Sequence, residues 1–319
     1  MDRGSFDRFL SRLTALDPRQ QERACLQLAQ LLCGERTAAI IEQARRGTLA
    51  CPRCRGTYLH GDGHKSGLQR YRCRQCGRSF NALTGTPLAR LRLKDHWLAY
   101  FDCLRDPACT VHSAAAIVGI HPNTSFRWRH RFLAWVKLDR PSCLQGIVEA
   151  DELFLLESEK GSWTLKRQPR KSGGVARRRG ISAEHVTIVL ARDRAGGTID
   201  FIAGRGAFHG TSLDQHLLPK LAPDVLLVSK GKPAYRRFAR RSGIAHRTAN
   251  VSLGIRTIDH AHLQNVNAYQ SRFNDWLRHF NGVATKYLSN YLGWRWAIDL
   301  LRIDAAETFL RAALGVFRT

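Results

Sequence analysis

The stretch that decides the fold is Ile147-Val-Glu-Ala-Asp-Glu-Leu-Phe-Leu155. Apolar residues on both sides of its acids predict a buried β-strand, and the strand pattern begins directly after Gly146. Asp151 lies in the middle of this strand. A carboxylate is costly inside a sheet unless it is paired or bound to a metal, so Asp151 is a candidate functional residue. The alternative is an acid at a strand end that faces water.

Downstream of this strand, the pattern continues through two more strands joined at a Gly-Gly turn, and helices and strands then alternate. Three strands followed by helix, strand, helix, strand and helix is the order of an RNase H-like domain, although many α/β domains begin in the same way. We therefore expect a five-stranded mixed sheet. The expected strands are 185–191, 198–202, 225–228 and 246–249, and the expected helices are 213–221, 233–241 and one from 261 beyond 276.

Upstream, the spacing of apolar and capping residues predicts a helix-turn-helix. A helix carrying Trp97 is followed by a second helix, from Thr110 to Gly119, and by a third that begins at Pro122. The third helix is expected to bury Phe126, Leu133 and Val136. Its outer face carries the expected DNA contacts, which are Asn123, Arg127 and Arg131. The alternative is a plain packing unit whose arginines are solvated.

Two C-x-x-C motifs precede these helices, at Cys51–Cys54 and Cys73–Cys76. Each short loop brings two thiolates to one ion, and four thiolates complete a closed tetrahedral Zn²⁺ site. Disulfides are the alternative, but a reducing compartment disfavours them. Tyr58, Tyr71 and Phe80 are expected to supply the small core of this zinc ribbon.

The chain is therefore expected to be an α+β multidomain protein. Residues before the zinc ribbon show the spacing of packing helices, with Gly34 as a plausible stop. The expected segments are a helical region at 1–46, the zinc ribbon at 47–90, the helix-turn-helix at 91–140, the RNase H-like domain at 145–300 and a final helix at 301–319.

Charge indicates a polyanionic partner. The chain has 51 Lys and Arg against 26 Asp and Glu, a net charge of +25, and nucleic acid explains that excess better than a membrane surface does. A generally basic, solvated surface is the alternative. The basic residues cluster in a loop expected to be flexible and to contact DNA, through Lys166, Arg167, Arg170, Lys171, Arg177, Arg178 and Arg179.

The sequence shows no apolar stretch of the roughly 18 residues that a spanning helix needs, and its first residues carry acids in place of a secretory signal. We therefore expect no membrane association and a cytoplasmic location on the nucleoid.

Beyond these patterns, the sequence resembles the transposases of a bacterial insertion-sequence family that combines a zinc ribbon, a helix-turn-helix and an RNase H-like domain. The matching stretches are Cys73–Phe80 with Leu83–Pro87, Val148–Glu152, His262–Tyr269, Phe280–Tyr287 and Tyr291–Arg295. The resemblance implies an Asp-Asp-Asn or Asp-Asp-Glu set that holds Mg²⁺ or Mn²⁺. It makes Asp151 the first metal-binding carboxylate and Asn267 the third position.

The second catalytic position departs from the family pattern. The family has Ser-Asp-Gly after the fourth strand, whereas this sequence has Ser229-Lys230-Gly231. An ammonium group cannot ligate Mg²⁺ and repels it at close range. Other acids, at Asp193, Asp200 and Asp224, are interpreted as solvated turn residues. An impaired catalytic centre on an intact scaffold is therefore expected.

The favoured function is that of a DNA transposase, acting as a homo-oligomer on double-stranded element ends and target DNA, with cleavage impaired by Lys230. A rival interpretation is a catalytically inactive, transposase-derived DNA-binding protein or repressor. A third, a zinc-ribbon transcription factor with an unrelated enzyme domain, leaves the combination of Asp151 and Asn267 unexplained.

Overall fold

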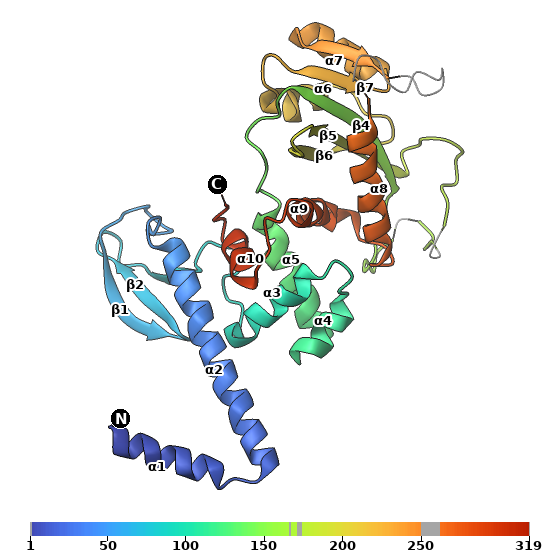
Figure 1. The fold of residues 1–319 in the computed structure, drawn as a ribbon. Coiled ribbons are helices and arrows are strands. Elements are labelled where there is room, and N and C mark those ends of the chain that lie inside the picture. Colours follow the sequence, from blue (N-terminus) through green and yellow to red (C-terminus); the bar gives the residue numbers. More distant parts are fainter. Residues whose placement is uncertain (1, 166, 171–173, 250–261, 319) are drawn as a thin grey trace. The chain divides into compact units, whose positions relative to one another are not determined.

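The computed structural model describes residues 2–165, 167–170, 174–249 and 262–318 (Figure 1). The chain divides into two compact units. Unit 1 contains Met1–Phe132 and Ile303–Thr319, and unit 2 contains Leu133–Arg302. Within the described ranges, no helix is both long enough and apolar enough to cross a membrane.

Unit 2 is built on a five-stranded mixed sheet, as the sequence predicts, and the strands lie in the order β6-β5-β4-β7-β8. The central strand β4 pairs antiparallel with β5 and parallel with β7, and β7 pairs parallel with β8. The bounds are β4 Ile147–Leu156, β5 His185–Asp193, β6 Thr198–Arg205, β7 Leu226–Ser229 and β8 Ala245–Thr248.

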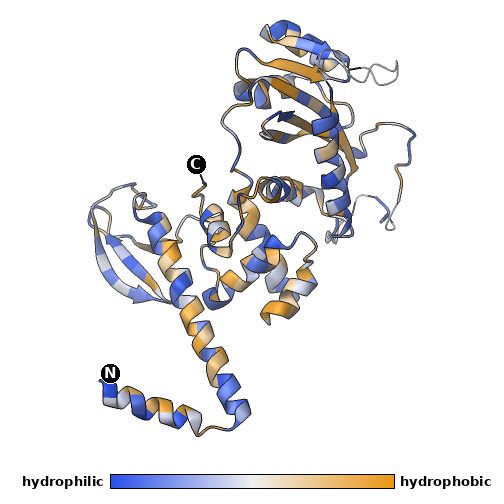
Figure 2. Cartoon of the chain, viewed as in Figure 1, coloured by the Kyte–Doolittle hydropathy of each residue, from blue (hydrophilic) through white to orange (hydrophobic). Residues whose placement is uncertain are grey.

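Helices cover the two faces of this sheet. Val148 and Ala150 face a core that includes Tyr235 and Phe238 of α7 (Pro233–Ser242), beside α6 (Gly210–His216) and the short helix η2 (Leu218–Lys220). Because side chains alternate along a strand, Glu149 and Asp151 point to the opposite face, where α8 (Gln264–Arg278) lies. The expected start of α8 near residue 261 falls outside the described residues. Figure 2 shows the hydrophobic colour concentrated along the strands.

Aromatic residues fix the end of α8 to α9 (Leu288–Asp299). The ring of Trp276 lies 5.0 Å from that of Trp294 and 5.9 Å from that of Tyr291, and all three side chains are buried. These rings therefore serve as packing residues between the two helices.

Unit 1 combines a small sheet with helices. The antiparallel strands β1 (Leu59–Lys65), β2 (Leu68–Cys73) and β3 (Ser79–Asn81) lie in that order. The helices are α1 (Arg3–Thr14), α2 (Pro18–Arg45), η1 (Lys94–His96), α3 (Trp97–Arg105), α4 (Val111–Val118), α5 (Pro122–Val136), which continues into unit 2, and α10 (Ala306–Ala313). Late in the sequence, α10 returns to unit 1, where the rings of Phe309 and Phe101 lie 5.0 Å apart.

The structure corrects the expected stop at Gly34, because α2 runs through this residue without interruption. A Cβ atom on Gly34 would lie 3.5 Å from the Cβ of Asp95, so the glycine allows η1 to approach the helix closely. That fit offsets the roughly 1 kcal/mol that glycine costs inside a helix.

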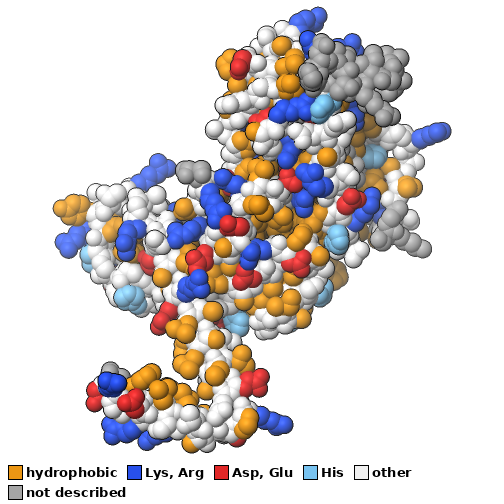
Figure 3. Space-filling model, in the orientation of Figure 1, with side chains coloured by type: hydrophobic (Ala, Val, Ile, Leu, Met, Phe, Trp, Pro, Cys, Tyr) orange, Lys and Arg blue, Asp and Glu red, His pale blue; other side chains and the backbone are white. Residues whose placement is uncertain are grey.

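The packing role expected for the first helices holds only for the end of α2, where Ile40 and Ile41 are buried. No residue of α1 is buried, and Leu26, Leu28, Leu31 and Leu32 of α2 are 44% to 66% exposed. Figure 3 shows these apolar side chains gathered over α1 and the adjoining half of α2.

Two further core assignments are wrong for reasons of periodicity. Phe126 is 44% exposed because the buried stripe of α5 runs through Ser125, Trp128 and Phe132, one residue out of phase with it. Tyr58 is 71% exposed, and Leu59, the next residue, packs on the cysteine cluster instead.

Candidate functional site

The register of the sheet brings Asp151 and Lys230 together. Ala150 of β4 pairs with Ser229 of β7 in parallel, so the residues that follow them lie side by side. Lys230 Nζ donates a 2.6 Å hydrogen bond to Asp151 Oδ2. The Asp151 side chain is 2% exposed, whereas that of Lys230 is 45% exposed. The buried carboxylate is therefore compensated by an ammonium group that reaches in from the surface.

A second acid–lysine pair lies next to the first. Lys232 Nζ donates to Glu152 Oε2 at 2.7 Å and lies 4.8 Å from the ring centre of Phe154. Burial raises the pKa of Glu152, although Lys232 opposes the shift. Burial, followed by the charges of Glu152 and Asp151, raises the pKa of Tyr235 well above its usual value. The loop after β7 thus neutralises two consecutive acids of β4.

Glu149 is a third buried acid of β4 that the sequence interpretation missed. Its Oε2 accepts a 3.0 Å hydrogen bond from the backbone N–H of Val266, in the first turn of α8, and its Oε1 lies 3.1 Å from Arg194. Leu263, which precedes α8, offers no side-chain cap, so Glu149 caps the helix from the strand. The signal in the sequence is the spacing of two residues from Asp151, which puts both acids on one face.

Asn267 lies on α8 between two contacts with β4. Val266 binds Glu149, and Gln270 Nε2 donates to the carbonyl oxygen of Glu152 at 3.0 Å. Asn267 precedes Gln270 by three residues, so these two lie on the same side of the helix, and Asn267 is exposed. The assignment of Asn267 to the third catalytic position stays a prediction.

The acids that were considered as substitutes for the missing carboxylate have other roles. Asp193 is buried and accepts a 2.8 Å hydrogen bond from the N–H of Gly197 in the β5–β6 turn. The side chain of Asp200 is 2% exposed and pairs with Arg140 at 2.7 Å. The expectation that these two acids are solvated is wrong, because both carboxylates are buried and each is held by a partner within the fold. Asp224 is exposed, as expected.

This site does not fit two divalent cations. Its donor set combines one carboxylate, Asp151, with an ammonium group bound to that carboxylate and an exposed amide. Among the residues that the structure describes, the only group of three or more His, Cys, Asp or Glu side chains able to hold a metal is the cysteine cluster.

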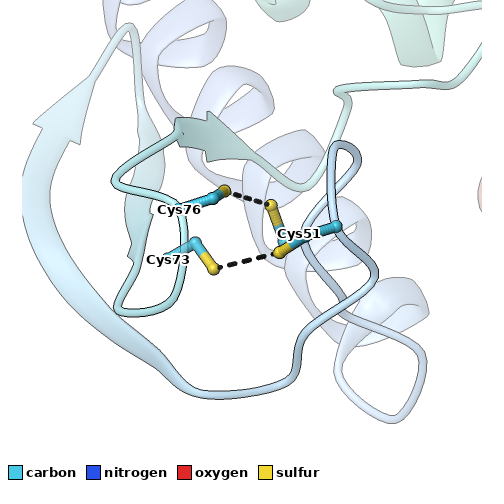
Figure 4. Close-up of side chains that lie close together, drawn as sticks. Cys51, Cys73 and Cys76 are labelled. Atoms are coloured by element: carbon cyan, nitrogen blue, oxygen red, sulfur yellow. Dashed lines mark hydrogen bonds between the residues drawn. The ribbon is translucent and has the colours of Figure 1, made fainter.

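The cysteine cluster, by contrast, fits one Zn²⁺ ion. The ligand sulfurs of Cys51, Cys54, Cys73 and Cys76 all lie within 4.8 Å of one another, and the distances from Cys51 to Cys76 and from Cys54 to Cys73 are 3.5 and 3.6 Å. A tetrahedral ion with Zn–S bonds of about 2.3 Å requires about 3.8 Å between sulfurs. Figure 4 shows three of these side chains pointing toward one another from two loops.

The two cysteine loops share one backbone geometry. Arg55 N–H donates to the carbonyl oxygen of Cys51, and Gly77 N–H donates to that of Cys73, each at 2.9 Å. Arg55 and Gly77 both have positive φ, which glycine adopts without strain. A hydrogen bond from the Cys54 backbone, opposed by burial, lowers the pKa of Cys51 to about 6. The thiolate form of Cys51 is thus favoured at neutral pH. For Cys54, a hydrogen bond from the backbone of Gly56 is outweighed by burial and the neighbouring sulfurs, which raise the pKa of this thiol.

The residues predicted to contact DNA differ in their surroundings. Asn123 and Arg127 are exposed on α5, whereas Arg131 is half-buried and donates to the carbonyl oxygens of Pro87 and Ala89. In the basic loop, Arg177, Arg178 and Arg179 are exposed. Lys166 and Lys171 lie outside the described residues.

Within the same loop, Arg167 and Arg170 turn inward. Both donate to the carbonyl oxygen of Glu157, and Arg170 also lies 3.4 Å from Glu184. The expectation of a wholly flexible loop is therefore wrong for these two residues, because neighbouring acceptors hold them.

Comparison with known proteins agrees with this architecture. Residues 143–296 match the family described as the ISXO2-like transposase domain. An uncharacterized protein in transposable element ISH50 of Halobacterium salinarum is 26% identical over 262 residues, which cover 81% of this chain and 87% of that protein. Over residues 143–296, the chain is thus similar to insertion-sequence transposases.

One solved structure, a pre-cleavage Mos1 transpososome, covers 69% of this chain and 79% of its own at 16% identity. Its TM-score of 0.21 is too low to carry a structural argument.

We expect the purified protein to carry about one equivalent of zinc per chain, measured by elemental analysis. Cys73→Ser should lose the metal and unfold the segment around the small sheet, because this segment buries little apolar surface without it. Cys25→Ser, at an exposed position outside the cluster, is the matched control and should keep its zinc. A zinc content below about half an equivalent, with Cys73→Ser folding normally, would contradict the assignment.

Proposed function

We propose that this chain is an insertion-sequence transposase homologue that binds double-stranded DNA and whose strand-cleavage centre is suppressed by the Lys230–Asp151 ion pair. Its sheet order supports an RNase H-like domain, and α3, α4 and α5 support a helix-turn-helix beside a zinc ribbon. The 2.6 Å contact between Lys230 Nζ and Asp151 Oδ2 is the observation that carries the proposal.

The ion pair opposes catalysis in two ways. Two-metal phosphoryl transfer needs carboxylates that hold both ions against the attacking and leaving oxygens. The ammonium group of Lys230 has no lone pair to give to a metal ion. It also pairs with Asp151, the one carboxylate left in the expected catalytic set. Removing the ammonium alone would leave Asp151 buried and uncompensated. An acid at position 230 would add a ligand as well, so that a divalent cation could compensate both carboxylates.

DNA binding is supported by exposed cations on both units. Arg127 lies on the exposed face of α5, and Arg177, Arg178 and Arg179 lie in the loop between β4 and β5. The arginine on α5 is placed to contact base edges, as in the second helix of a helix-turn-helix, whereas the loop arginines suit phosphates. Arg131 contributes by fixing the segment before α3, through the carbonyl oxygens of Pro87 and Ala89.

Self-association is supported by the apolar surface of α1 and α2. Phe6, Phe9, Leu10 and Leu13 recur on one face of α1. Gln21 Nε2 donates to the carbonyl oxygens of Leu13 and Thr14, and Asp17 forms a capping box with Gln20, so the corner between the helices is fixed. Because the corner is fixed, α1 and α2 do not bury each other's apolar faces. A second copy of the chain carries the same faces and could pack against them.

Restoring the acid should restore metal binding. We expect Lys230→Asp to bind Mn²⁺, measured by calorimetry, and to nick element-end DNA at least about tenfold faster than the unmodified protein, because it removes a cation and adds a ligand. The double variant Lys230→Asp, Asp151→Ala should lose both gains. Lys232→Asp is the matched control and should bring no gain. Equal nicking by the unmodified protein and Lys230→Asp would show that the centre is not suppressed.

DNA binding should depend steeply on salt. If about six phosphates are contacted, log K against log[salt] should have a slope of about −5. Replacing Arg178 and Arg179 by alanine should make the slope shallower by about two with sequence preference unchanged, whereas Arg127→Ala should relax preference. Arg19→Ala, exposed on α2, is the control. A slope near zero would contradict DNA binding through these cations.

Self-association should depend on the apolar faces of α1 and α2. We expect sedimentation equilibrium to show a dimer or a larger assembly, and the double variant Phe9→Glu, Leu31→Glu to be monomeric, because buried carboxylates would remain unpaired in the interface. Ile117→Glu, at a position 70% exposed on α4, should leave the assembly intact. A monomeric unmodified protein would disprove this interface.

A further inference from the structure

One tryptophan of unit 2 is fully exposed. The side chain of Trp163 is 100% exposed, whereas Trp97, Trp128, Trp276, Trp294 and Trp296 are at most 4% exposed. A single exposed apolar residue is ordinary on a protein surface. Trp163 differs because the segment that carries it is fixed by hydrogen bonds and borders a cavity.

The segment before Trp163 is anchored to the residues that follow α8. Ser158 and Thr285 exchange two hydrogen bonds, of 2.8 and 2.9 Å. Lys160 Nζ donates to the carbonyl oxygens of Phe280, Asn281 and Gly282 at 3.4, 3.1 and 3.1 Å. A turn closed by Ser162 N–H and the carbonyl oxygen of Glu159 then leads directly to Trp163. The Trp163 ring therefore extends from a turn that these hydrogen bonds fix in place.

A cavity of about 650 Å³ lies beside this turn. Leu156, Leu165 and Pro169 give it an apolar lining. Its charged lining consists of four cations, Lys160, Arg167, Arg170 and Arg278, and two acids, Glu157 and Glu159. Its volume falls within the roughly 300–1,000 Å³ typical of small-ligand pockets. An apolar lining beside guanidinium groups suits the chemistry of a nucleotide, whose base is flat and whose phosphate is anionic. Ser162, the residue before Trp163, lines the same cavity.

We infer that Trp163 stacks on an unpaired base of a DNA strand and that the neighbouring cavity accepts the unpaired nucleotide. This inference rests on the proposed DNA binding. Stacking of a base on an aromatic ring contributes about 1–3 kcal/mol and tolerates any base. The turn is fixed to the strand that carries Asp151 and to the segment after the helix that carries Asn267, so the unpaired nucleotide would be held by the same unit as the candidate centre.

The test uses the full chain and two DNAs of equal length, one fully paired and one with a short unpaired end that carries 2-aminopurine. We expect the unpaired end to bind at least about fivefold more tightly, and the 2-aminopurine fluorescence to fall as the base stacks. Trp163→Ala should lose both effects while its affinity for paired DNA is unchanged. Trp163→Phe, which keeps a ring, should retain part of the preference, and Thr164→Ala is the neighbouring control.

The outcomes separate this inference from the proposed function. Equal binding of both DNAs by the unmodified protein, or a preference that survives in Trp163→Ala, would overturn the stacking role. An equal loss of both DNAs in Trp163→Ala would also overturn it, because the ring would then be a general DNA contact. Failure of the unmodified protein to bind either DNA would instead refute the proposed DNA binding.

Discussion

The burial of three carboxylates on one strand is the constraint around which unit 2 is organised. Glu149, Asp151 and Glu152 of β4 are all nearly inaccessible to water, and a buried charge without compensation is very costly. Different parts of the chain compensate these acids. Arg194 and the start of α8 contact Glu149, and the loop after β7 contacts the other two. The same contacts that neutralise the strand therefore also position the helix and loop around it.

An ammonium group and a divalent cation are alternative answers to this constraint. Clustered carboxylates repel one another unless a metal ion is bound between them. Lys230 is part of the chain, so its positive charge is present without any bound ion. Under the proposed function, Lys230 thus supplies the compensating charge that a metal ion would otherwise supply. Lys232 strengthens this effect, since it places a second cation at the neighbouring acid. The outcome is a folded centre whose electrostatic balance is complete without an added ion.

The sequence predicted the elements of unit 2 better than their contacts. Strand β4, the order of strands and helices and the grouping of four cysteines follow from local patterns, which need no knowledge of the third dimension. The Lys230–Asp151 contact depends on the register between β4 and β7, and the capping of α8 by Glu149 joins residues far apart in the chain. Phe126 was misplaced because a helical stripe displaced by one residue is equally apolar. No local pattern reveals such choices.

The return of α10 to unit 1 has a consequence for synthesis. Phe101 of α3 and Phe309 of α10 are both fully buried where they meet, yet the whole of unit 2 lies between them in the chain. At about 5–20 residues per second, a ribosome needs on the order of ten seconds to translate that interval. While unit 2 is being translated, the aromatic surface of α3 stays exposed, because α10 has not yet been made. A nascent chain is therefore not yet able to complete its first unit, and chaperones have their main opportunity to act during this delay.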